Sequence, residues 1–490
     1  MDSILSKEGR EKLGITVKKA EDFSEWYTQV VLKAEIADYA TIKGFMVLRP
    51  NGYEIWEIIK DYFDSEIKKT GHRNAYFPTL IPESLLKKEG EHFAGFVPEV
   101  FWVTKSGNSD LSDPLAVRPT SETIIHDSMK NWIRSWRDLP MLLNVWNSVL
   151  RAEIKSTKPF LRTSEFLWQE GHTAHATEQE AEKEVKDILS LYLQVVEDLL
   201  ALPAIAGRKS DKEKFVGAVY TDTLEAMMPD GRALQMCTSH QLGQNFSKPF
   251  EIRFLGEDGE MHYVWQTSWG ISWRVIGSLI MIHGDDKGLV LPPRVAPIQA
   301  VIVPILFSGG SKGAQVTDRC MQVAETLKQS NVRVHFDSRE NYTAGWKFNE
   351  WEMKGIPLRI EIGPRDIENN TAVCVRRDNG SKQSVSIPEL ASSVSKTLEA
   401  IQSSLKEKAF QKLKEQIHDA KSFEDLEKQI GGEGGFVRAF WCGSRDCEDK
   451  IKDKTGADIR VIPFDQKDVD GTCIFCGKRA KSLVYFARAY

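Results

Sequence analysis

The sequence predicts a multidomain α+β protein, and three observations carry that prediction. The first 290 residues contain long amphipathic helices and a strand hairpin with period-two alternation. Short strands then alternate with helices, which is typical of a small α/β domain with a mixed sheet. Four of the seven cysteines lie beyond residue 441, which indicates a small metal-binding tail.

Composition and charge are those of an ordinary globular protein. Of the 490 residues, 41% are hydrophobic and 28% are charged, and the formal net charge is −5. Because this charge gives no overall basic field, we expect no DNA partner, and an RNA would have to meet local basic patches. Neither a long apolar run nor the apolar core of a secretory signal is present, so we expect no membrane association and a cytoplasmic location.

Residues 52–70 are predicted to form a long amphipathic helix. Apolar residues recur at helical spacing from Ile55 onward, and Gly71 provides a stop signal. Residues 74–81 are then predicted to form a strand that carries Pro78. Because proline cannot donate a ladder hydrogen bond, this strand should lie at a sheet edge or contain a bulge.

The remainder of the first domain is predicted to contain a second long helix, a strand and a buried helix. The long helix covers residues 178–201. The strand covers 262–269 and should be broken by Gly270, and the buried helix covers 271–283. The run "GLVLPPRVAP" at 288–297 marks a domain boundary.

These features divide the chain into four parts. The first domain covers residues 1–290, and the α/β domain with a mixed sheet covers 291–395. A charged helical connector follows over 396–430. The cysteine-rich tail covers 431–490 and begins at the glycine-rich "GGEGG".

The segment 144–171 is predicted to form a hairpin with charged and aromatic side chains on one face. In the first arm, Arg151 and Glu153 share a face. The second arm places five alternate residues on a common face, namely Arg162, Ser164, Phe166, Trp168 and Glu170.

These residue types suit a bound nucleoside triphosphate. Two guanidinium groups can bind a polyanion in forked geometry. Phe166 offers a ring for a planar base, and Glu153 can accept a hydrogen bond from an exocyclic amine. The alternative is a solvated face of cross-strand ion pairs, each worth roughly 0.2–1 kcal/mol. Arg274 favours the nucleotide site, because it follows a strand–Gly–helix break that is otherwise without charge.

The hairpin and its neighbours resemble the three signature motifs of class II aminoacyl-tRNA synthetases. "VLRAE" and "FLRTSEF" are similar to the second motif, an Arg-x-Glu, a loop and an Arg-x-x-x-Phe. "WGISWRVIG" is similar to the third motif, although Ser272 replaces its usual second glycine. The helix of 52–70 and the strand with Pro78 resemble the first motif.

Further segments narrow the resemblance to the prolyl-tRNA synthetases of the archaeal and eukaryotic type. These segments are "RPTSET", "FLWQEGHTA", "CTSHQLGQNF" and "GWKFNEWEMKGIPLRIEIGPRD", together with the four-cysteine tail. The resemblance covers nearly the whole chain. The stretch between residues 171 and 269 is too short to hold the large editing domain of bacterial forms.

The resemblance implies ATP-dependent ligation of L-proline to tRNA(Pro) through a prolyl-adenylate. It implies a class II antiparallel-sheet catalytic domain over 1–290, an anticodon-binding domain over 291–395 and a zinc-binding α/β tail over 431–490. It also implies a homodimer formed through the first-motif helix and strand. The terminal Tyr490 would fold back toward the catalytic domain.

For the nucleotide, the resemblance implies a role for each site residue. Arg151 would meet the α-phosphate and the proline carboxylate, and Glu153 would read the adenine amino group. Phe166 would stack on adenine, and Arg274 would close over its other face. The outer phosphates, the ribose and Mg²⁺ would be met by Arg162, Thr163, Gln235, Thr238 and Ser272. Arg151 and Arg274 are the expected catalytic residues, because attack on a phosphate needs alignment and charge neutralisation rather than an enzyme nucleophile.

For proline, the resemblance implies that Thr120 and Glu122 hold the secondary ammonium beside Arg151. Trp168 and His240 would form the walls of that pocket. A Thr-x-Glu pair can instead be a helix capping box, and a tryptophan in a strand can instead be a core residue.

The tail carries the metal signal. Its four cysteines occur as two close pairs, which suits a closed tetrahedral zinc site. They are Cys442, Cys447, Cys473 and Cys476. The alternative is four free thiols. His172 and His175 could also bind a metal, but a structural role is the preferred interpretation.

In the α/β domain, the resemblance implies four anticodon-reading residues: Phe348, Glu352, Arg359 and Arg365. Unpaired bases are read by stacking and by hydrogen bonds to their edges, which these side chains can supply. The alternative is an ordinary charged surface.

Two other functions stay open from the sequence. One is a catalytically silent, synthetase-like tRNA-binding regulator. The other is a sister enzyme for threonine, serine or glycine, and the zinc in the pocket of the threonine enzyme would need ligands that the sequence does not identify.

Overall fold

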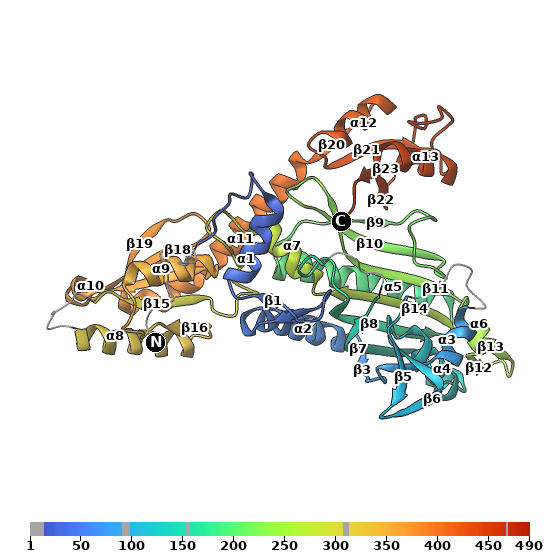
Figure 1. Ribbon diagram of the computed structural model, residues 1–490, viewed down its shortest axis with the longest axis horizontal. Coiled ribbons are helices and arrows are strands. Elements are labelled where there is room, and N and C mark those ends of the chain that lie inside the picture. The colour runs from blue at the N-terminus through green and yellow to red at the C-terminus, as the bar shows by residue number, and fades with distance from the viewer. Residues whose placement is uncertain (1–13, 91–98, 153–156, 307–312, 467–468) are drawn as a thin grey trace.

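The computed structural model describes residues 14–90, 99–152, 157–306, 313–466 and 469–490. Figure 1 shows a large sheet-based body, an α/β unit to its left and a smaller C-terminal unit above it. The long helix α11 (Leu390–Glu415) runs between the α/β unit and the C-terminal unit. The α+β architecture predicted from the sequence is confirmed.

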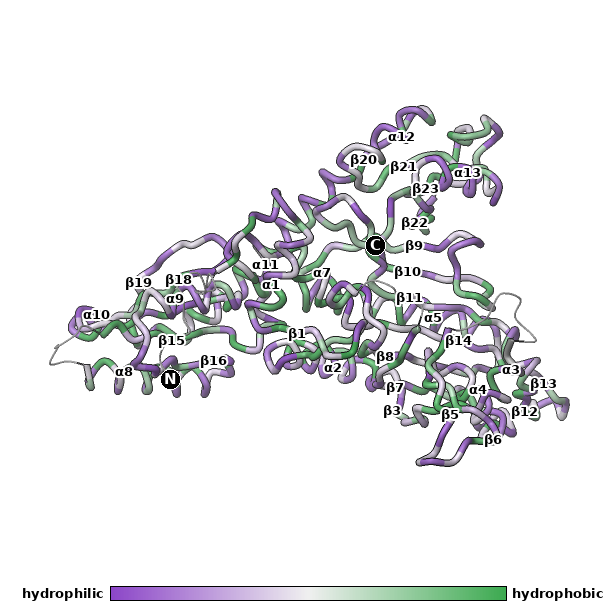
Figure 2. Tube along the Cα trace, in the orientation of Figure 1, coloured by the Kyte–Doolittle hydropathy of each residue, from purple (hydrophilic) through white to green (hydrophobic). Residues whose placement is uncertain are grey.

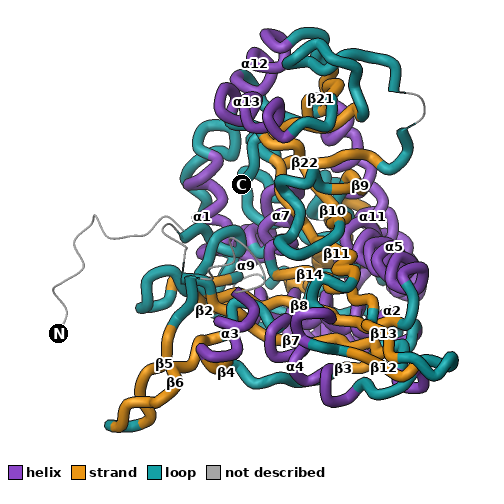
Figure 3. Tube along the Cα trace, turned by 90° about the vertical axis from the view of Figure 1, so that its right-hand side faces the viewer, coloured by secondary structure: helices purple, strands orange, loops and turns teal. Residues whose placement is uncertain are grey.

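A largely antiparallel sheet forms the centre of the body and continues into the C-terminal unit. Its strands follow the order β20-β21-β23-β22-β9-β10-β11-β14-β8-β7-β3, and Figure 3 shows them as one column through both units. The join is made by β22 and β9, where Ile462 pairs with Arg208. The strands of the body are β3 (Arg73–Asn74), β7 (Met141–Leu150), β8 (Glu165–His175), β9 (Ile205–Arg208), β10 (Tyr220–Met227), β11 (Ala233–Gly243) and β14 (Trp265–Ser272).

Helices cover one face of this sheet and bury its apolar side chains. Trp269 of β14 packs against Phe63 and Tyr192 with ring centroids 6.4 Å from each. Gly171 makes room for this indole, because a Cβ atom there would lie 2.0 Å from the Trp269 ring. The helices are α1 (Phe23–Lys33), α2 (Pro50–Lys69), α5 (Glu178–Gln194) and α7 (Arg274–His283). In Figure 2, α7 is among the most hydrophobic segments, as its buried position requires.

The two long helices predicted from periodicity are confirmed. The first corresponds to α2, which is followed by Gly71 at a φ of 94°. The second corresponds to α5, which begins behind the N-cap Thr177. Its last predicted turn differs, because residues Val195–Leu199 form a π-helical turn.

The predicted strand 74–81 is wrong as a continuous element. The chain instead forms β3 and β4 (Leu80–Pro82), and Pro78 lies between them. Proline has no N–H to donate to a strand ladder, so the pairing stops at Pro78. The predicted edge position is confirmed, because β3 pairs only with β7 at the end of the sheet order.

The prediction that the strand over residues 262–269 ends at Gly270 is also wrong. β14 runs through Gly270, which pairs with Thr238 on one side and Glu170 on the other. The strand lies between β11 and β8, and their hydrogen bonds override the weak strand preference of glycine. A separate short strand, β13 (Met261–Tyr263), precedes β14, and α7 begins only at Arg274.

Smaller elements surround the open face and edge of the sheet. They are β1 (Ala37–Tyr39), β2 (Met46–Leu48), α3 (Glu83–Gly90), β5 (Trp102–Ser106), β6 (Ser109–Val117), α4 (Glu122–Trp132), a 3₁₀ turn (Trp136–Asp138), α6 (Ser247–Phe250) and β12 (Arg253–Leu255).

The α/β unit contains the predicted mixed sheet. β15 is parallel to β16 and β17, whereas β17, β18 and β19 are antiparallel. Its strands are β15 (Ala300–Pro304), β16 (Val334–Phe336), β17 (Leu358–Ile362), β18 (Thr371–Arg376) and β19 (Lys382–Ser386). Its helices are α8 (Gly313–Gln329), α9 (Ala344–Met353), α10 (Pro364–Asn369) and a 3₁₀ turn (Ile387–Glu389).

Helix α11 contacts all three parts of the molecule. Its first turns contribute Val394 to the core of the α/β unit, Leu405 packs beside Val290 of the body, and Leu413 packs beside Phe436 of the C-terminal unit. The expected boundary at residue 395 therefore falls inside one continuous helix.

The C-terminal unit begins inside the stretch 396–430, which was expected to be a helical connector. β20 (Ile417–Asp419) interrupts that stretch and pairs with β21 (Phe436–Trp441). The other elements of the unit are α12 (Phe423–Gly431), α13 (Arg445–Thr455), β22 (Asp458–Pro463) and β23 (Ser482–Ala487). As the resemblance implied, Tyr490 returns to the body, where its hydroxyl donates to Asp230 Oδ2 at 2.5 Å.

Candidate active site

A cavity of about 610 Å³ lies on the open face of the central sheet. Ten residues assigned from the sequence line it together. They are Thr120, Glu122, Arg151, Phe166, Trp168, Gln235, Thr238, His240, Ser272 and Arg274. Segments more than 150 residues apart thus meet around one space, because β8, β11 and β14 are neighbours in the sheet.

The pleat of β8 and a bulge in β11 decide which side chains face the cavity. On β8, the Gln169 side chain faces the helix-covered side of the sheet, where its Oε1 accepts a hydrogen bond from Tyr192 Oη at 2.6 Å. The alternate residues Phe166 and Trp168 face the cavity, as the period of two predicts. On β11, the bulge opposite Leu224 shifts the alternation, so that Gln235 also lines the cavity.

Two arginines from distant parts of the chain, Arg151 and Arg274, line the cavity. The Arg151 guanidinium lies 5.1 Å from the Phe166 ring centroid, and its Nε donates to the Pro119 carbonyl at 3.4 Å. Arg274 is the first residue of α7, and its Nη1 donates to the Gln235 carbonyl at 3.4 Å. Burial, and next the positive charge of Arg151, lower the pKa of Arg274 to about 10. A bound anion would relieve both effects.

The remaining nucleotide-side residues are less central. Arg162 is exposed and does not line the cavity, although its charge also lowers the pKa of Arg274, less than burial and Arg151 do. Thr163 is buried beside it, outside the cavity lining. Glu153 lies outside the described residues.

The part of the cavity around Glu122 and Glu170 is acidic. Thr120 Oγ1 donates to the Glu122 carboxylate, which is 5% exposed. The capping-box alternative does not apply, because Ser121 is the N-cap of α4 and Glu122 is its first residue. Trp168 donates from Nε1 to Asn147 Oδ1 at 2.5 Å and lines the cavity, so it is a wall rather than a core residue.

Two further residues complete this group. The sequence placed Glu170 on the shared face without a role, and it favoured a structural role for His172. His172 Nε2 lies 3.1 Å from Glu170 Oε2, and Asn147 Nδ2 donates to Glu170 Oε1 at 2.8 Å. The ligand atoms of Glu122, Glu170 and His172 lie within 4.8 Å of one another. Glu170 and His172 continue the period-two alternation of Phe166 and Trp168 along β8, and this alternation was the signal that could have linked His172 to the cavity residues.

The charges of this group are set by burial and by mutual contact. Burial, helped by the charge of Glu170, raises the pKa of Glu122. Burial alone would lower the pKa of His172, but the bond to Glu170 and the charge of Glu122 outweigh it and raise this pKa. Burial would raise the pKa of Glu170, but the bond to His172 outweighs it and lowers the pKa. Two carboxylates beside one imidazolium carry a net charge of about −1, which suits one ammonium group.

His240 is a neutral wall of the same pocket. Burial, and then the charge of His172, lower its pKa to about 3. Its ring nitrogens lie 2.8 Å from Thr221 Oγ1 and 3.0 Å from Thr238 Oγ1. The imidazole therefore adds no charge near the carboxylates.

A second cavity, of about 310 Å³, lies in the α/β unit. Phe348, Glu352 and Arg359 line it, and the Arg359 guanidinium lies 4.1 Å from the Phe348 ring centroid. Lys287 pairs with Glu352 at 2.9 Å. Arg365 lies in α10, outside the lining of this cavity.

The four tail cysteines converge. Their Sγ atoms all lie within 4.8 Å of one another, with Cys442 3.6 Å from Cys447 and 3.8 Å from Cys476. Zn–S bonds of about 2.3 Å in a tetrahedron place sulfurs roughly 3.8 Å apart. The donor set and its spacing therefore fit a structural zinc ion.

Among the described residues, no helix combines the length and apolarity needed to cross a bilayer.

Comparisons with known proteins agree with this geometry. Residues 101–283 match the class II tRNA synthetase core domain for Gly, His, Pro, Ser and Thr. Residues 299–397 match the anticodon binding domain, and residues 423–490 match the C-terminal domain of prolyl-tRNA synthetase.

Relatives and a solved structure match over the full length. The proline–tRNA ligase of Cenarchaeum symbiosum is 58% identical, over 98% of this chain and 100% of its own. That of Natranaerobius thermophilus is 51% identical, over 99% of this chain and 100% of its own. The crystal structure of prolyl-tRNA synthetase from Cryptosporidium parvum, complexed with halofuginone and AMPPNP, matches at a TM-score of 0.93 and 46% identity, covering 98% of this chain and 100% of that one. The chain therefore belongs to the prolyl-tRNA synthetases, class II enzymes of the archaeal and eukaryotic type.

Proposed function

We propose that this proline–tRNA ligase activates L-proline with ATP and then transfers the prolyl group to tRNA(Pro), using the residues of the sheet cavity. One observation carries the proposal. A single cavity is lined by Arg151, Arg274 and Phe166 and also by Glu122 and Glu170, which lie beside the buried His172. Such a space accepts a nucleotide and an ammonium-bearing acid together.

In the first step, the proline carboxylate attacks the α-phosphate of ATP and pyrophosphate leaves. Arg151, between the two halves of the cavity, neutralises the carboxylate and the α-phosphate and aligns them. Phe166 stacks on adenine, and Arg274 covers its other face. The surrounding contacts to ATP are proposed for Glu153, Arg162, Thr163, Gln235, Thr238 and Ser272.

The cavity also fits Mg²⁺. Gln235 and Thr238 line the Arg274 side with amide and hydroxyl oxygens, which are hard ligands. They would hold the ion together with the phosphates of ATP. When bound, Mg²⁺ supplies charge neutralisation to the leaving pyrophosphate.

Proline is held on the acidic side. Glu122 and Thr120 accept the secondary ammonium, and the negative charge of the buried group balances it. Trp168 and His240 enclose the ring with an apolar and a neutral surface. Arg151 receives the carboxylate at the border with ATP.

The anticodon is read in the α/β unit. We assign Phe348, Glu352 and Arg359 to this role, because they share one cavity with cationic neighbours. Arg365 would contact the RNA only outside that cavity. A zinc ion held by the four tail cysteines would stabilise the C-terminal unit.

Dimer formation and a cytoplasmic location complete the proposal. Large apolar side chains are exposed on α2, on β1 and β2 before it, and in the segment between β3 and β4 after it. A partner subunit would cover them. They include Tyr39, Val47, Tyr53 and Tyr76, which are 48%, 51%, 45% and 76% exposed.

The test is amino-acid-dependent ATP–pyrophosphate exchange with the purified full chain. Exchange should depend on proline, and tRNA(Pro) should then become charged. If no amino acid supports exchange while tRNA(Pro) still binds, the chain is instead a silent tRNA-binding regulator. Threonine-, serine- or glycine-dependent exchange would reassign the substrate.

A further inference from the structure

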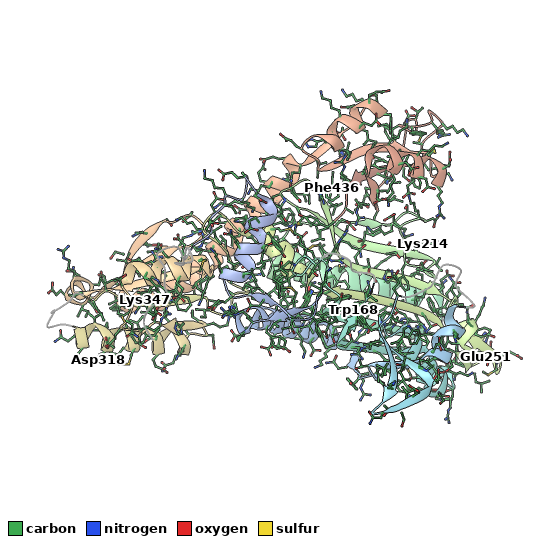
Figure 4. All side chains as sticks on the ribbon, viewed as in Figure 1. Trp168, Lys214, Glu251, Asp318, Lys347 and Phe436 are labelled. Atoms are coloured by element: carbon green, nitrogen blue, oxygen red, sulfur yellow. The ribbon has the colours of Figure 1, made fainter. Side chains whose placement is uncertain are left out.

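The loop between β9 and β10, residues 209–219, forms one wall of the active-site cavity. Glu213, Phe215 and Val216 of this loop line the cavity. In Figure 4, Lys214 marks this loop on the side of the body that faces the C-terminal unit. Strand β22 of that unit is hydrogen-bonded to β9, directly before the loop.

A buried charge cluster joins the loop to the C-terminal unit. It consists of Lys209, Glu225 of β10 and Arg460 of β22, which are 4%, 0% and 7% exposed. Lys209 Nζ donates to Glu225 Oε1 at 2.5 Å. Arg460 donates to Glu225 Oε2 from Nη2 at 2.8 Å and from Nε at 3.0 Å. Buried charges add little net stability by themselves. We therefore expect this cluster to have a role other than stability.

Glu225 stands directly behind the nucleotide side of the cavity. It is the register partner of Gln235 at the β10–β11 bulge. Gln235 lines the cavity and accepts the hydrogen bond from Arg274. Burial and the charge of Arg151 lower the pKa of Arg274, whereas the charge of Glu225 opposes them and acts to raise it. Whatever fixes Glu225 therefore fixes the surroundings of Arg274.

Further contacts from the C-terminal unit hold successive loop residues. Ser210 Oγ donates to Glu448 Oε1 at 2.6 Å, and Lys212 Nζ lies 2.7 Å from Asp449 Oδ1. Glu213, which lines the cavity, has its Oε2 3.9 Å from Arg460 Nη1. The wall of the cavity is thus anchored to the C-terminal unit rather than to the body alone.

We propose that Arg460 of the C-terminal unit is a positioning residue for adenylate formation. It fixes Glu225 behind Gln235 and Arg274, and it anchors the loop 209–219. The C-terminal unit is then part of the active-site scaffold, although none of its described residues lines the cavity. The inference rests on the proposed function of the cavity.

The test compares KM and kcat in proline-dependent exchange. Arg460→Met alone leaves Glu225 with one counter-charge and can unfold the chain. The double variant Glu225→Gln/Arg460→Met removes two of the three charges, and Lys209, whose pKa burial lowers, can release its proton instead of staying charged and unpaired. This variant should fold with a melting temperature near that of the wild type. We expect its KM for ATP to rise about tenfold, as for other coupled neighbours. A purely structural pair would be fully rescued in the double variant.

The control is a matched pair in the same unit. Arg438 donates to Asp419 from Nε and from Nη2, both at 2.7 Å, but this pair is surface-exposed and away from the loop. The double variant Asp419→Asn/Arg438→Met should keep the wild-type KM values. A stable Glu225→Gln/Arg460→Met variant with KM for ATP and for proline within twofold of wild type would overturn the proposal.

A second comparison needs no buried charge to be removed. Lys212→Ala breaks the contact with Asp449. Lys214→Ala breaks two contacts inside the loop, the 2.9 Å pair with Asp211 and the 3.2 Å hydrogen bond to the Val219 carbonyl. Lys212→Ala should raise KM for proline several-fold and Lys214→Ala should not. Equal KM values in these two variants would also count against the proposal. Absence of exchange in the wild type would instead refute the proposed function, before any variant is compared.

Discussion

At the scale of single residues, adenylate formation should depend most strongly on Arg151. Its guanidinium lines the cavity, 5.1 Å from the Phe166 ring centroid and 6.0 Å from that of Trp168. We expect Arg151→Ala to reduce proline-dependent pyrophosphate exchange by about 100-fold or more, because it removes charge stabilisation at the reacting centre. The fold should stay intact, as judged by circular dichroism and the melting temperature.

Arg137 offers a matched control for this substitution. It also stacks on an aromatic ring, 4.6 Å from the Trp136 centroid, but it is exposed and does not line the cavity. Arg137→Ala should exchange pyrophosphate as the wild type does. Near-normal exchange by Arg151→Ala would refute the role proposed for it.

Proline binding should weaken on acidification. The ammonium needs an ionised Glu122, and burial raises the pKa of this carboxyl, so it protonates at a higher pH than an ordinary glutamate. KM for proline should therefore rise as pH falls, beginning above the usual glutamate pKa of about 4.3. Glu122→Gln should raise KM roughly tenfold or more and remove this acid limb.

KM for ATP provides the internal reference for the pH experiment. It depends on the arginines, which stay charged over the same range. If KM for proline stays flat down to the ordinary glutamate range while KM for ATP also stays flat, Glu122 is not the counter-charge.

The residue scale also shows how far sequence pattern reaches. The alternation in β8 correctly placed Phe166 and Trp168 on one face with Glu170. It did not assign roles to Glu170 and His172, since their meaning depends on Glu122, which lies on a different element and meets them only in the fold.

At the scale of elements, the C-terminal unit should depend on its metal. Cys447 and Cys473 belong to the core of this unit, beside Ile451 and Val484. We expect Cys442→Ser to lower the zinc content well below one ion per chain and to lower the melting temperature, because structural zinc contributes on the order of 10 kcal/mol to small modules. Metal analysis and calorimetry measure both effects.

A buried cysteine elsewhere serves as the control. Cys374 lies in β18 of the α/β unit, 5% exposed. Cys374→Ala should leave the zinc content unchanged. Full zinc content in Cys442→Ser would show that the four cysteines do not act as one site.

Helices and strands were predictable where a strong local pattern ran for many residues. They were not predictable where pairing with distant strands determined the structure. The periodicity of α2 and α5 was sufficient to locate them. By contrast, Gly270 remains in β14 because strands on both sides hold it, and β20 replaces part of an expected helix because β21 pairs with it. Pairing partners far away in the sequence override weak local preference.

At the scale of the whole molecule, amino-acid activation and anticodon reading should be separable. Arg359 lines the cavity of the α/β unit, far along the chain from the residues of the sheet cavity. Arg359→Ala should raise KM for tRNA(Pro) roughly tenfold, by loss of a charged contact, and leave tRNA-free exchange unchanged. Arg365→Ala is the comparison, because Arg365 lies outside that cavity and its substitution should raise this KM less. Equal effects of the two substitutions would contradict the assignment.

Whole-molecule architecture also bears on accuracy. The curated relatives match over their full length, and the stretch between residues 171 and 269 leaves no room for a large editing domain. Each missing methylene costs only about 1–3 kcal/mol of discrimination. Alanine should therefore support weak pyrophosphate exchange, and alanyl-tRNA(Pro) should accumulate in a charging assay. Complete rejection of alanine in both assays would contradict this expectation.

The sequence by itself determined the order of a sheet-based body, an α/β unit and a cysteine-rich tail, ten of the residues that line the sheet cavity and the four cysteines of the tail. These follow from local spacing and from motifs that each fit within a short segment. Only the tertiary structure decided which charges meet: the buried group of Glu122, Glu170 and His172, the position of Arg365 outside the cavity of the α/β unit, and the hydrogen bonds of Arg460 to Glu225. The reason is physical, because the energy of a charge depends on its burial and on partners that chain folding alone brings within a few ångströms.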